Sequence, residues 1–296
     1  MSSKVVIVRA GYKNAGGRVP SDVLQRMFSG GLSFVSDQGD GRESDLGLGG
    51  EKGKIGIKIN TIGGQRISTD PETAFSLAKV LVKRGTNANS VIIWDRTNRE
   101  LKEAGYKLHM NGNEWKIFGT DTRGVGYGSN LTAHRSIGSL FSAIQADLIA
   151  ISISLAILKD HGLAGVTAGM KNYFGAIHNP NKYHDSNCNP YIADLFDSAP
   201  VKQKHRMTIL DALTVQYHRG PSFHAEWAEK CGALVFSRDP VAADCVGWQI
   251  IEKLRFKKGL PSLKEENREP EYLHTAARSG LGTADGDRIQ IIETEV

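Results

Sequence analysis

The stretch SVIIWDRTNRELKEAGY, residues 90–106, contains the structural unit that decides the fold of this chain. Its apolar residues Val91–Trp94 form an uninterrupted run, which indicates a strand buried on both faces. A polar turn begins at Asp95, and an amphipathic helical pattern follows it. A strand, a turn and a helix in this order are typical of a sheet that helices cover on both faces.

The same unit recurs along the chain. KIGIKINTIGG (residues 54–64) reads as a strand ending in a glycine turn, and a helix follows it at residues 68–85. Thr69 or Asp70 can cap that helix, and Pro71 suits its first turn. Similar units are expected at residues 136–162 and 232–259.

This alternation predicts an α/β fold with a mainly parallel sheet and helices on both faces, a Rossmann-like three-layer architecture. We expect a single α/β domain over residues 1–296, with a Gly-rich loop or insertion at about residues 36–53.

Composition excludes several classes of protein. Hydrophobic residues make up 40% of the chain and charged residues 23%, which is ordinary for a soluble globular protein. The net charge is +5, but the basic residues are scattered and accompany no nucleic-acid motif, so no nucleic-acid partner is expected. The most membrane-like segment, residues 140–158, is interrupted by Gln145 and Asp147, so no membrane span is expected.

The start of the chain and its cysteines bear on compartment and cofactors. No signal peptide is visible, which predicts a cytoplasmic protein, or an exported one if a signal segment has been removed. The three cysteines lack CxxC spacing, which argues against a disulfide framework and against a four-cysteine cluster.

Polar residues that follow the expected strands are the first candidates for a site, because ligands of parallel sheets bind at the carboxyl ends of the strands. This rule selects Asn60, Asp95, His161, Asp211 and Asp239. Asp239 also precedes a proline at a helix start, so capping is the favoured interpretation there.

Two arginines follow Asp95 at the end of its strand. Arg96 and Arg99 can hold a carboxylate or phosphate in a bidentate way, or they can be solvated residues of a first helical turn. The sequence alone leaves both interpretations open.

The stretch DHGLAGVTAGMKNYFGAIHNPNKYHDSNC, residues 160–188, crowds further reactive groups together. Lys171 lies among small and aromatic residues, where a lowered pKa favours covalent or acid–base roles; the alternative is a surface lysine. His178 and His184 flank a turn and could converge on a metal. His161 precedes a glycine, so it could also be an ordinary residue at the end of a helix.

Four stretches carry a family resemblance. KDHGLAGVTAGMKNYFGAIHNPNKYH, GIKINTIGG, VIIWDRTNRELKEAGY and RDPVAADCVGWQIIE resemble the family called domain of unknown function 362, over most of the chain from about residue 54. Some members of that family carry ferredoxin-type modules or twin-arginine export signals, and this sequence shows neither.

A more distant resemblance concerns mechanism. DRTNR, followed by His161, Lys171 and His184 in this order, is similar to the layout of the nickel-pincer lactate racemase family. The resemblance implies that His161 is an acid/base and that Lys171 bears the cofactor. It further implies that His184 or His178 is a metal ligand and that His134 is the second catalytic base.

These observations favour a cofactor- or metal-dependent enzyme, of isomerase or oxidoreductase type, acting on a small hydroxy or oxo acid. Its cofactor would be a transition metal (Ni, Fe or Zn) or a lysine-linked organic group, its partner a small-molecule substrate, and a homo-oligomer stays open. The candidate catalytic residues are His161, Lys171, His134 and Asp95, and the candidate substrate-binding residues are Arg96, Arg99, Asn60, Asn172 and Asp211.

Two alternatives remain. One is a metal- or iron–sulfur-associated binding or electron-carrier protein without its own catalysis. The other is a divalent-metal lyase or hydrolase that uses His184, Asp185 and Asp211.

Overall fold

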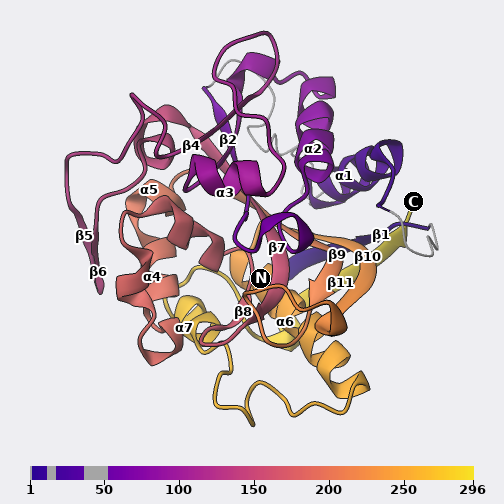
Figure 1. Cartoon of the computed structure of the whole chain (residues 1–296). Helices are drawn as coiled ribbons and strands as arrows, with labels where there is room; N and C mark the ends of the chain where they lie inside the picture. Colours follow the sequence, from indigo (N-terminus) through magenta and orange to yellow (C-terminus); the bar gives the residue numbers. More distant parts are fainter. Residues whose placement is uncertain (1, 12–17, 37–52) are drawn as a thin grey trace.

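A large twisted sheet forms the centre of the molecule (Figure 1). The computed structural model describes residues 2–11, 18–36 and 53–296. The strands lie in the order β11 (Ile289–Glu295), β1 (Ser3–Arg9), β10 (Ala228–Ser237), β9 (His205–Gln216), β7 (Ile151–His161), β2 (Ile55–Lys58), β3 (Val91–Asp95) and β4 (Lys116–Gly119). The short strand β8 (Gly165–Thr167) pairs with β7 outside this order.

The sheet is mostly parallel, as predicted. The pairs β1–β11, β7–β9, β2–β7, β2–β3 and β3–β4 are all parallel. β10 is antiparallel to both of its neighbours, β1 and β9, so it runs against the other strands of this order.

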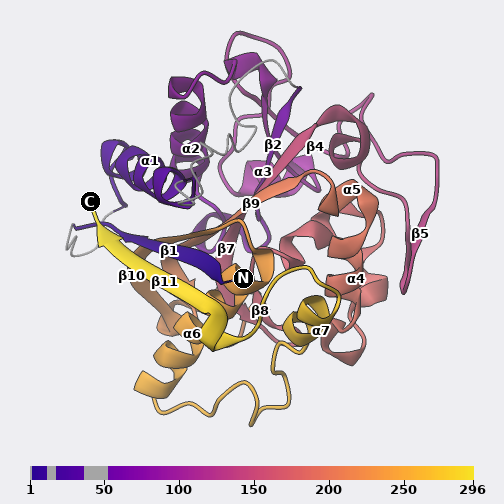
Figure 2. The same cartoon turned by 180° about the vertical axis from the view of Figure 1, so that it is seen from behind.

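Helices cover both faces of the sheet (Figures 1 and 2). Val6 and Val8 of β1 pack into a core with helices α1 to α3, whereas Val5 and Ile7 pack into a second core with helices α4 to α7. Because successive strand side chains point to opposite faces, these two cores lie on opposite sides of the sheet. The helices are α1 (Ser21–Ser36), α2 (Pro71–Lys83), α3 (Asn98–Glu103), α4 (Tyr191–Asp197), α5 (Ala199–Lys202), α6 (Pro240–Lys257) and α7 (Tyr272–Arg278).

Capping side chains fix where the helices begin. Asp70 is the N-cap of α2 and accepts a hydrogen bond of 2.9 Å from the Glu72 backbone N–H. Asp239 caps α6 by accepting from Val241 and Ala242, each at 2.9 Å, so the structural interpretation of Asp239 is confirmed.

Asp239 does not lie at the edge of the sheet where it was expected. It follows β10, the reversed strand, so it lies at the edge opposite the carboxyl ends of β2, β3 and β7. Its carboxylate also accepts from Ser3 at the start of β1 and from the Thr283 N–H, and this position separates it from the groups described below.

Residues 136–162 differ from the expected strand–turn–helix unit. β6 (Ile137–Ser139) pairs with β5 (Thr132–His134) in a separate hairpin that projects from the molecule (Figure 1). One π-helical turn, Ile144–Leu148, follows, and the remaining apolar residues form the long buried strand β7. The β-branched residues of this segment pack in the centre of the sheet, where an extended strand suits them.

The remaining short elements are 3₁₀ turns at Gly64–Arg66, Ala88–Ser90, Lys171–Ala176, Pro180–Tyr183, Ser186–Cys188, Ala225–Trp227 and Gly286–Arg288. The Gly-rich loop expected at about residues 36–53 falls almost wholly on residues 37–52, outside the described part of the chain. Within that part, no helix combines the length and the hydropathy that crossing a membrane requires.

Candidate functional site

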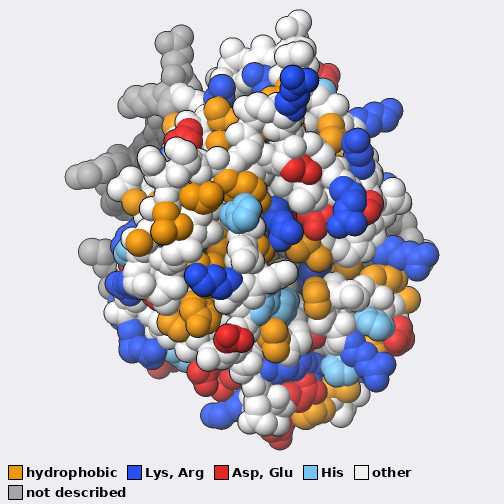
Figure 3. All heavy atoms as spheres, turned by 60° about the vertical axis from the view of Figure 1, so that its left-hand side comes forward, with side chains coloured by type: hydrophobic (Ala, Val, Ile, Leu, Met, Phe, Trp, Pro, Cys, Tyr) orange, Lys and Arg blue, Asp and Glu red, His pale blue; other side chains and the backbone are white. Residues whose placement is uncertain are grey.

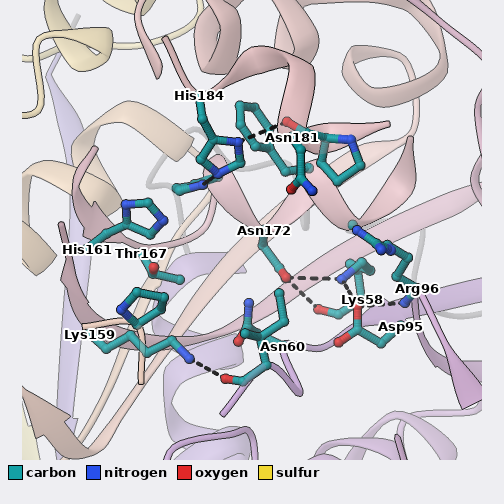
Figure 4. A pocket seen from close by; sticks show the side chains of 16 residues that line it. Lys58, Asn60, Asp95, Arg96, Lys159, His161, Thr167, Asn172, Asn181 and His184 are labelled. Carbon is teal, nitrogen blue, oxygen red and sulfur yellow. Dashed lines mark hydrogen bonds and ion pairs between the residues drawn. The ribbon is translucent and has the colours of Figure 1, made fainter. Parts of the chain in front are cut away.

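A cavity of about 160 Å³ lies at the carboxyl ends of β2, β3 and β7. Figure 3 shows a face of the molecule on which Lys, Arg and His side chains gather around a hollow. Figure 4 shows the side chains that line the cavity, which come from all three strand ends and from the segment after β8. The carboxyl-edge rule therefore leads to a real cavity in this sheet.

Lys58 and Asp95 form a buried ion pair beside this cavity. The Lys58 Nζ–Asp95 Oδ1 distance is 2.6 Å, and the Lys58 side chain is 1% exposed. Lys58 also donates to the Ile59 carbonyl oxygen at 2.7 Å and to Asn172 Oδ1 at 3.2 Å, so its three N–H groups all have acceptors. The charge of Lys58 is thus neutralised within the protein.

The Asp95 carboxylate joins the ends of β2 and β3. Its Oδ2 accepts from the Thr61 backbone N–H at 2.7 Å and from the Thr61 hydroxyl at 2.6 Å. Its Oδ1 accepts from Lys58 and from the Arg96 backbone N–H at 2.7 Å. With four donors on its two oxygens, Asp95 shapes the floor of the cavity, and its predicted catalytic role would require breaking these bonds.

Asn172 connects this floor to the segment that carries Lys171. Its side-chain amide donates to the Lys58 carbonyl oxygen at 2.9 Å and to Ser154 Oγ at 3.0 Å. Two residues before Lys171 the chain is anchored again, because Asp244 accepts from Gly169 and Met170 N–H at 2.8 and 3.0 Å. The start of the 3₁₀ turn Lys171–Ala176 is therefore held by hydrogen bonds just before and just after Lys171.

Lys171 lies inside the protein next to a histidine. It is 7% exposed, and its Nζ lies 3.3 Å from His184 Nε2 and 4.3 Å from the centre of the Phe174 ring. Burial lowers the pKa of Lys171 to about 8, although the nearby Cys188 opposes this shift. About a tenth of Lys171 is therefore a neutral amine at pH 7, compared with less than about a thousandth of an ordinary lysine.

The hydrogen bonds of His184 define its tautomer. His184 Nδ1 lies 3.0 Å from the Pro180 carbonyl oxygen, which can only accept, so Nδ1 carries the proton. Nε2 of the neutral ring is then an acceptor, and it faces the Lys171 ammonium. Burial, followed by the charge of Lys171, lowers the pKa of His184, which keeps the ring neutral and its Nε2 lone pair free to accept a hydrogen bond.

His161 has the opposite arrangement. Its Nδ1 accepts from the backbone N–H groups of Leu163 and Ala164 at 3.2 and 3.1 Å, so in the neutral ring the proton is on Nε2. Burial lowers the pKa of His161 to about 2, and the charge of Lys171 contributes to the shift. His161 stacks on His184, with ring centres 5.8 Å apart, and it presents a neutral N–H donor at the cavity.

Lys159, Arg96 and Asn60 also line the cavity. Lys159 donates to the Ile62 and Ile67 carbonyl oxygens, and burial lowers its pKa to about 7. Arg96 is half-buried at the start of the turn that leads into α3. Asn60 is 8% exposed, and its Oδ1 has no hydrogen-bond partner among the described residues.

Four of the predicted site residues lie outside the cavity lining. Asp211 is buried within β9, where it accepts from the Leu213 N–H, and burial raises its pKa to about 7. Arg99 is exposed on α3. His134 pairs with Asp197 at 2.9 Å on the projecting hairpin, and His178 is exposed against the Tyr127 ring.

The expected metal ligands do not form a cluster. Within residues 2–11, 18–36 and 53–296, no three His, Cys, Asp or Glu side chains are placed to hold a metal ion together. His184 lines the cavity, but His178 does not, and Asp185 is exposed.

Sequence reasoning missed Lys58 and Lys159. Lys58 lies between two isoleucines in GIKI, and Lys159 directly follows the apolar run Leu155–Leu158 in the same expected strand. A lysine at such a position has no route to solvent if the strand is central, and this signal could have identified both as buried cations.

Comparison with known proteins identifies the family of this chain. Residues 55–249 match the model of the family described as domain of unknown function 362. The chain belongs to this family. The predicted resemblance is thereby confirmed, and the matched residues of this domain of unknown function 362 protein include all the cavity residues discussed above.

A crystal structure of a Thermotoga maritima protein, solved by a structural genomics consortium, is similar to this chain with a TM-score of 0.48 and 12% identity. The match covers 83% of this chain and 60% of the Thermotoga chain. No curated protein matches this sequence. The resemblance to the lactate racemase family stays a prediction.

Proposed function

We propose that this protein is an enzyme that acts on a small oxo or hydroxy acid and uses Lys171 to bond covalently to its substrate. One observation carries the proposal: a buried lysine with a pKa of about 8 lies 3.3 Å from a histidine nitrogen that can accept its proton. A nucleophile paired with a base inside a cavity is the arrangement that covalent catalysis requires.

The neutral amine of Lys171 would add to the carbonyl carbon of an oxo acid. A carbon–nitrogen bond forms, both amine hydrogens leave with the carbonyl oxygen as water, and an imine remains. His184 Nε2 lies where it can take a proton from the amine and return it to the departing oxygen. The imine draws electrons from the neighbouring carbon, whose proton His184 can then remove and return, which is isomerase-type chemistry.

His161 would stabilise the developing charge on the substrate oxygen. Its Nε2–H is a fixed donor, because the backbone N–H groups of Leu163 and Ala164 occupy Nδ1. A neutral imidazole with a strongly lowered pKa polarises a carbonyl as a hydrogen-bond donor without transferring its own proton. We therefore assign His161 as a donor, in place of the acid/base role expected from the sequence.

The residues of the cavity suit one of the two candidate cofactors better than the other. A lysine-linked organic cofactor would use the buried amine of Lys171 in place of a substrate imine, and when bound it would supply an electron acceptor for oxidation of a hydroxy acid. A metal ion held by protein donors alone does not fit, because the described residues offer no cluster of His, Cys, Asp or Glu. No step is assigned to a metal, and no observation favours the carrier or metal-hydrolase alternatives.

Reductive trapping tests the proposal. The purified protein is incubated with a panel of 2-oxo acids and borohydride, and adducts are located by intact and peptide mass spectrometry. We expect one adduct, on Lys171, which Lys171→Ala abolishes and Lys182→Ala, a change of an exposed lysine in the same segment, leaves intact. Modification spread over exposed lysines, with Lys171 unreacted, would refute it.

A further inference from the structure

The cations of the cavity exceed its anions. Asp95 neutralises Lys58 at 2.6 Å, and it is the one carboxylate among the described lining residues. Arg96, Lys159 and Lys171 then remain without a carboxylate partner in the described part of the chain. Once Lys171 has bonded to a substrate, Arg96 and Lys159 are left as basic side chains of the lining, and an anion beside Lys159 would favour its charged form.

These two cations lie on opposite sides of the cavity. Figure 4 shows Arg96 on the side of Asp95 and Lys159 on the far side, below His161. Arg96 belongs to the turn after β3, and Lys159 belongs to the end of β7, with β2 between them in the sheet. The cavity therefore offers two positions for anionic groups, one at each of these side chains.

Asn60 lies between Arg96 and Lys159 in the same view and points into the cavity (Figure 4). Its Oδ1 is buried without a hydrogen-bond partner among the described residues. A buried acceptor without a donor is unfavourable, and a hydroxyl group of a bound ligand would satisfy it. This unpaired atom is an independent indication that the space between the two cations receives a polar ligand.

Cations that are removed from water are unfavourable unless an anion accompanies them. Burial lowers the pKa of Lys159 to about 7, the charge of Asp95 opposes this shift, and the charge of Lys171 adds to it. A ligand with one anionic group would leave the positive charge at one end of the cavity without a nearby anion. A ligand with two separated anionic groups would compensate both ends.

We propose that the site binds small dicarboxylates, with one carboxylate on Arg96, the other on Lys159, and the oxo or hydroxy carbon between them beside Lys171. This inference deepens the proposed function and rests on it for the position of the reacting carbon. The recognition of a dianion, however, follows from Arg96 and Lys159 alone.

Calorimetric titration with unreactive probes tests the recognition separately. Succinate carries two carboxylates, propionate carries one, and inorganic phosphate places its charge on a single centre. Since none of them has a ketone or aldehyde carbonyl, none can form an imine with Lys171. We expect wild-type protein to bind succinate at least about tenfold more tightly than propionate or phosphate.

Arg96→Met should weaken succinate binding by about tenfold or more and leave propionate nearly unchanged, because Lys159 still holds one carboxylate. Lys102→Met, which removes an exposed cation from the neighbouring helix α3, is the matched control and should bind as wild type does. Lys159→Met, at the other end of the cavity, should likewise weaken succinate binding and leave propionate binding nearly unchanged.

Equal affinity for succinate and propionate, phosphate binding as tight as that of succinate, or failure of all three to bind would each overturn the proposal. So would unchanged succinate binding in Arg96→Met. Because the probes cannot react, these outcomes are independent of the trapping experiment: a dianion preference without an adduct on Lys171 would refute the chemistry alone. An adduct without a dianion preference would refute the substrate class alone.

Discussion

Lys171 Nζ lies 3.3 Å from His184 Nε2, and the Pro180 carbonyl holds the proton of that imidazole on the other nitrogen. The relationship makes His184 an acceptor at the one atom that faces the amine. A lysine that is both desolvated and placed against such an acceptor can lose a proton within the cavity, which a solvated lysine near neutral pH does not do.

The rate of adduct formation on Lys171 should depend on pH with a midpoint near 8. The reactive form is the neutral amine, so the rate should rise with pH, level off above the pKa of about 8, and fall about tenfold per pH unit well below it. Borohydride trapping with one 2-oxo acid at a series of pH values measures this. A rate that still rises steeply beyond pH 9 would show an ordinary lysine.

Replacement of His161 by Phe should slow the reaction. It should not alter the acid limb of the pH–rate profile, where the rate falls as pH decreases. Loss of one preorganised donor to the substrate oxygen lowers kcat by about 10²–10³-fold. Because the pKa of His161 is lowered to about 2, its ring stays neutral throughout the range from pH 5 to 8. Disappearance of a limb between pH 6 and 7 in the variant would instead identify His161 as an acid/base.

Asp211→Asn should change the pH dependence of stability. Burial raises the pKa of Asp211 to about 7 in the folded protein, from an ordinary value of 3.8. Between these two values the folded state binds more protons than the unfolded state, so this group makes the free energy of unfolding fall as pH rises from about 4 to 7. The loss is complete above about pH 7.

The Asp211→Asn variant has no ionisable group at this position, so its free energy of unfolding does not fall in this way. Relative to wild type, its free energy of unfolding should therefore increase between about pH 4 and 7, by up to about 4 kcal/mol. Urea unfolding at pH 4.5 and 8 measures the difference. A difference between variant and wild type that is the same at both pH values would show that Asp211 is not a strained buried acid.

Gly175→Ala should destabilise the protein, whereas Gly138→Ala should not. A Cβ at Gly175 would lie 2.8 Å from Lys58 Nζ and 3.1 Å from Asp95 Oδ1, which are fixed in the buried ion pair. Such overpacking costs about 1–3 kcal/mol in the free energy of unfolding. Gly138 has open space where a Cβ would be, so it is the matched control. Equal midpoints in thermal unfolding of the two variants would contradict the rigid floor described here.

The sequence predicted the fold well where local patterns determine the outcome. The apolar run Val91–Trp94, the turn at Asp95 and the cap at Asp70 all depend on residues within one turn or strand, and they occur as expected. The direction of β10 depends on how distant strands pair, which no local pattern contains. For this reason Asp239 was expected at the wrong edge of the sheet.

The candidate site was predicted in part. His161, Lys171, His184, Asp95, Arg96, Asn60 and Asn172 do line one cavity, because the carboxyl ends of parallel strands meet. Asp211 was grouped with them although it lies in the middle of its strand, and His134 lies on a hairpin that the sequence did not reveal. Lys58 and Lys159 were missed because lysine is usually exposed, and only the central position of β2 and β7 buries them.

Competitive labelling of the lysines tests the central claim most directly. The purified protein is acylated with a trace of reagent at pH values from 6 to 11, and peptide mass spectrometry gives the titration of each lysine separately. We predict that Lys171 titrates near 8, well below the ordinary value of 10.5. The exposed Lys182 serves as the internal reference. Titration of Lys171 together with that reference, or complete protection of Lys171 at every pH, would contradict the account.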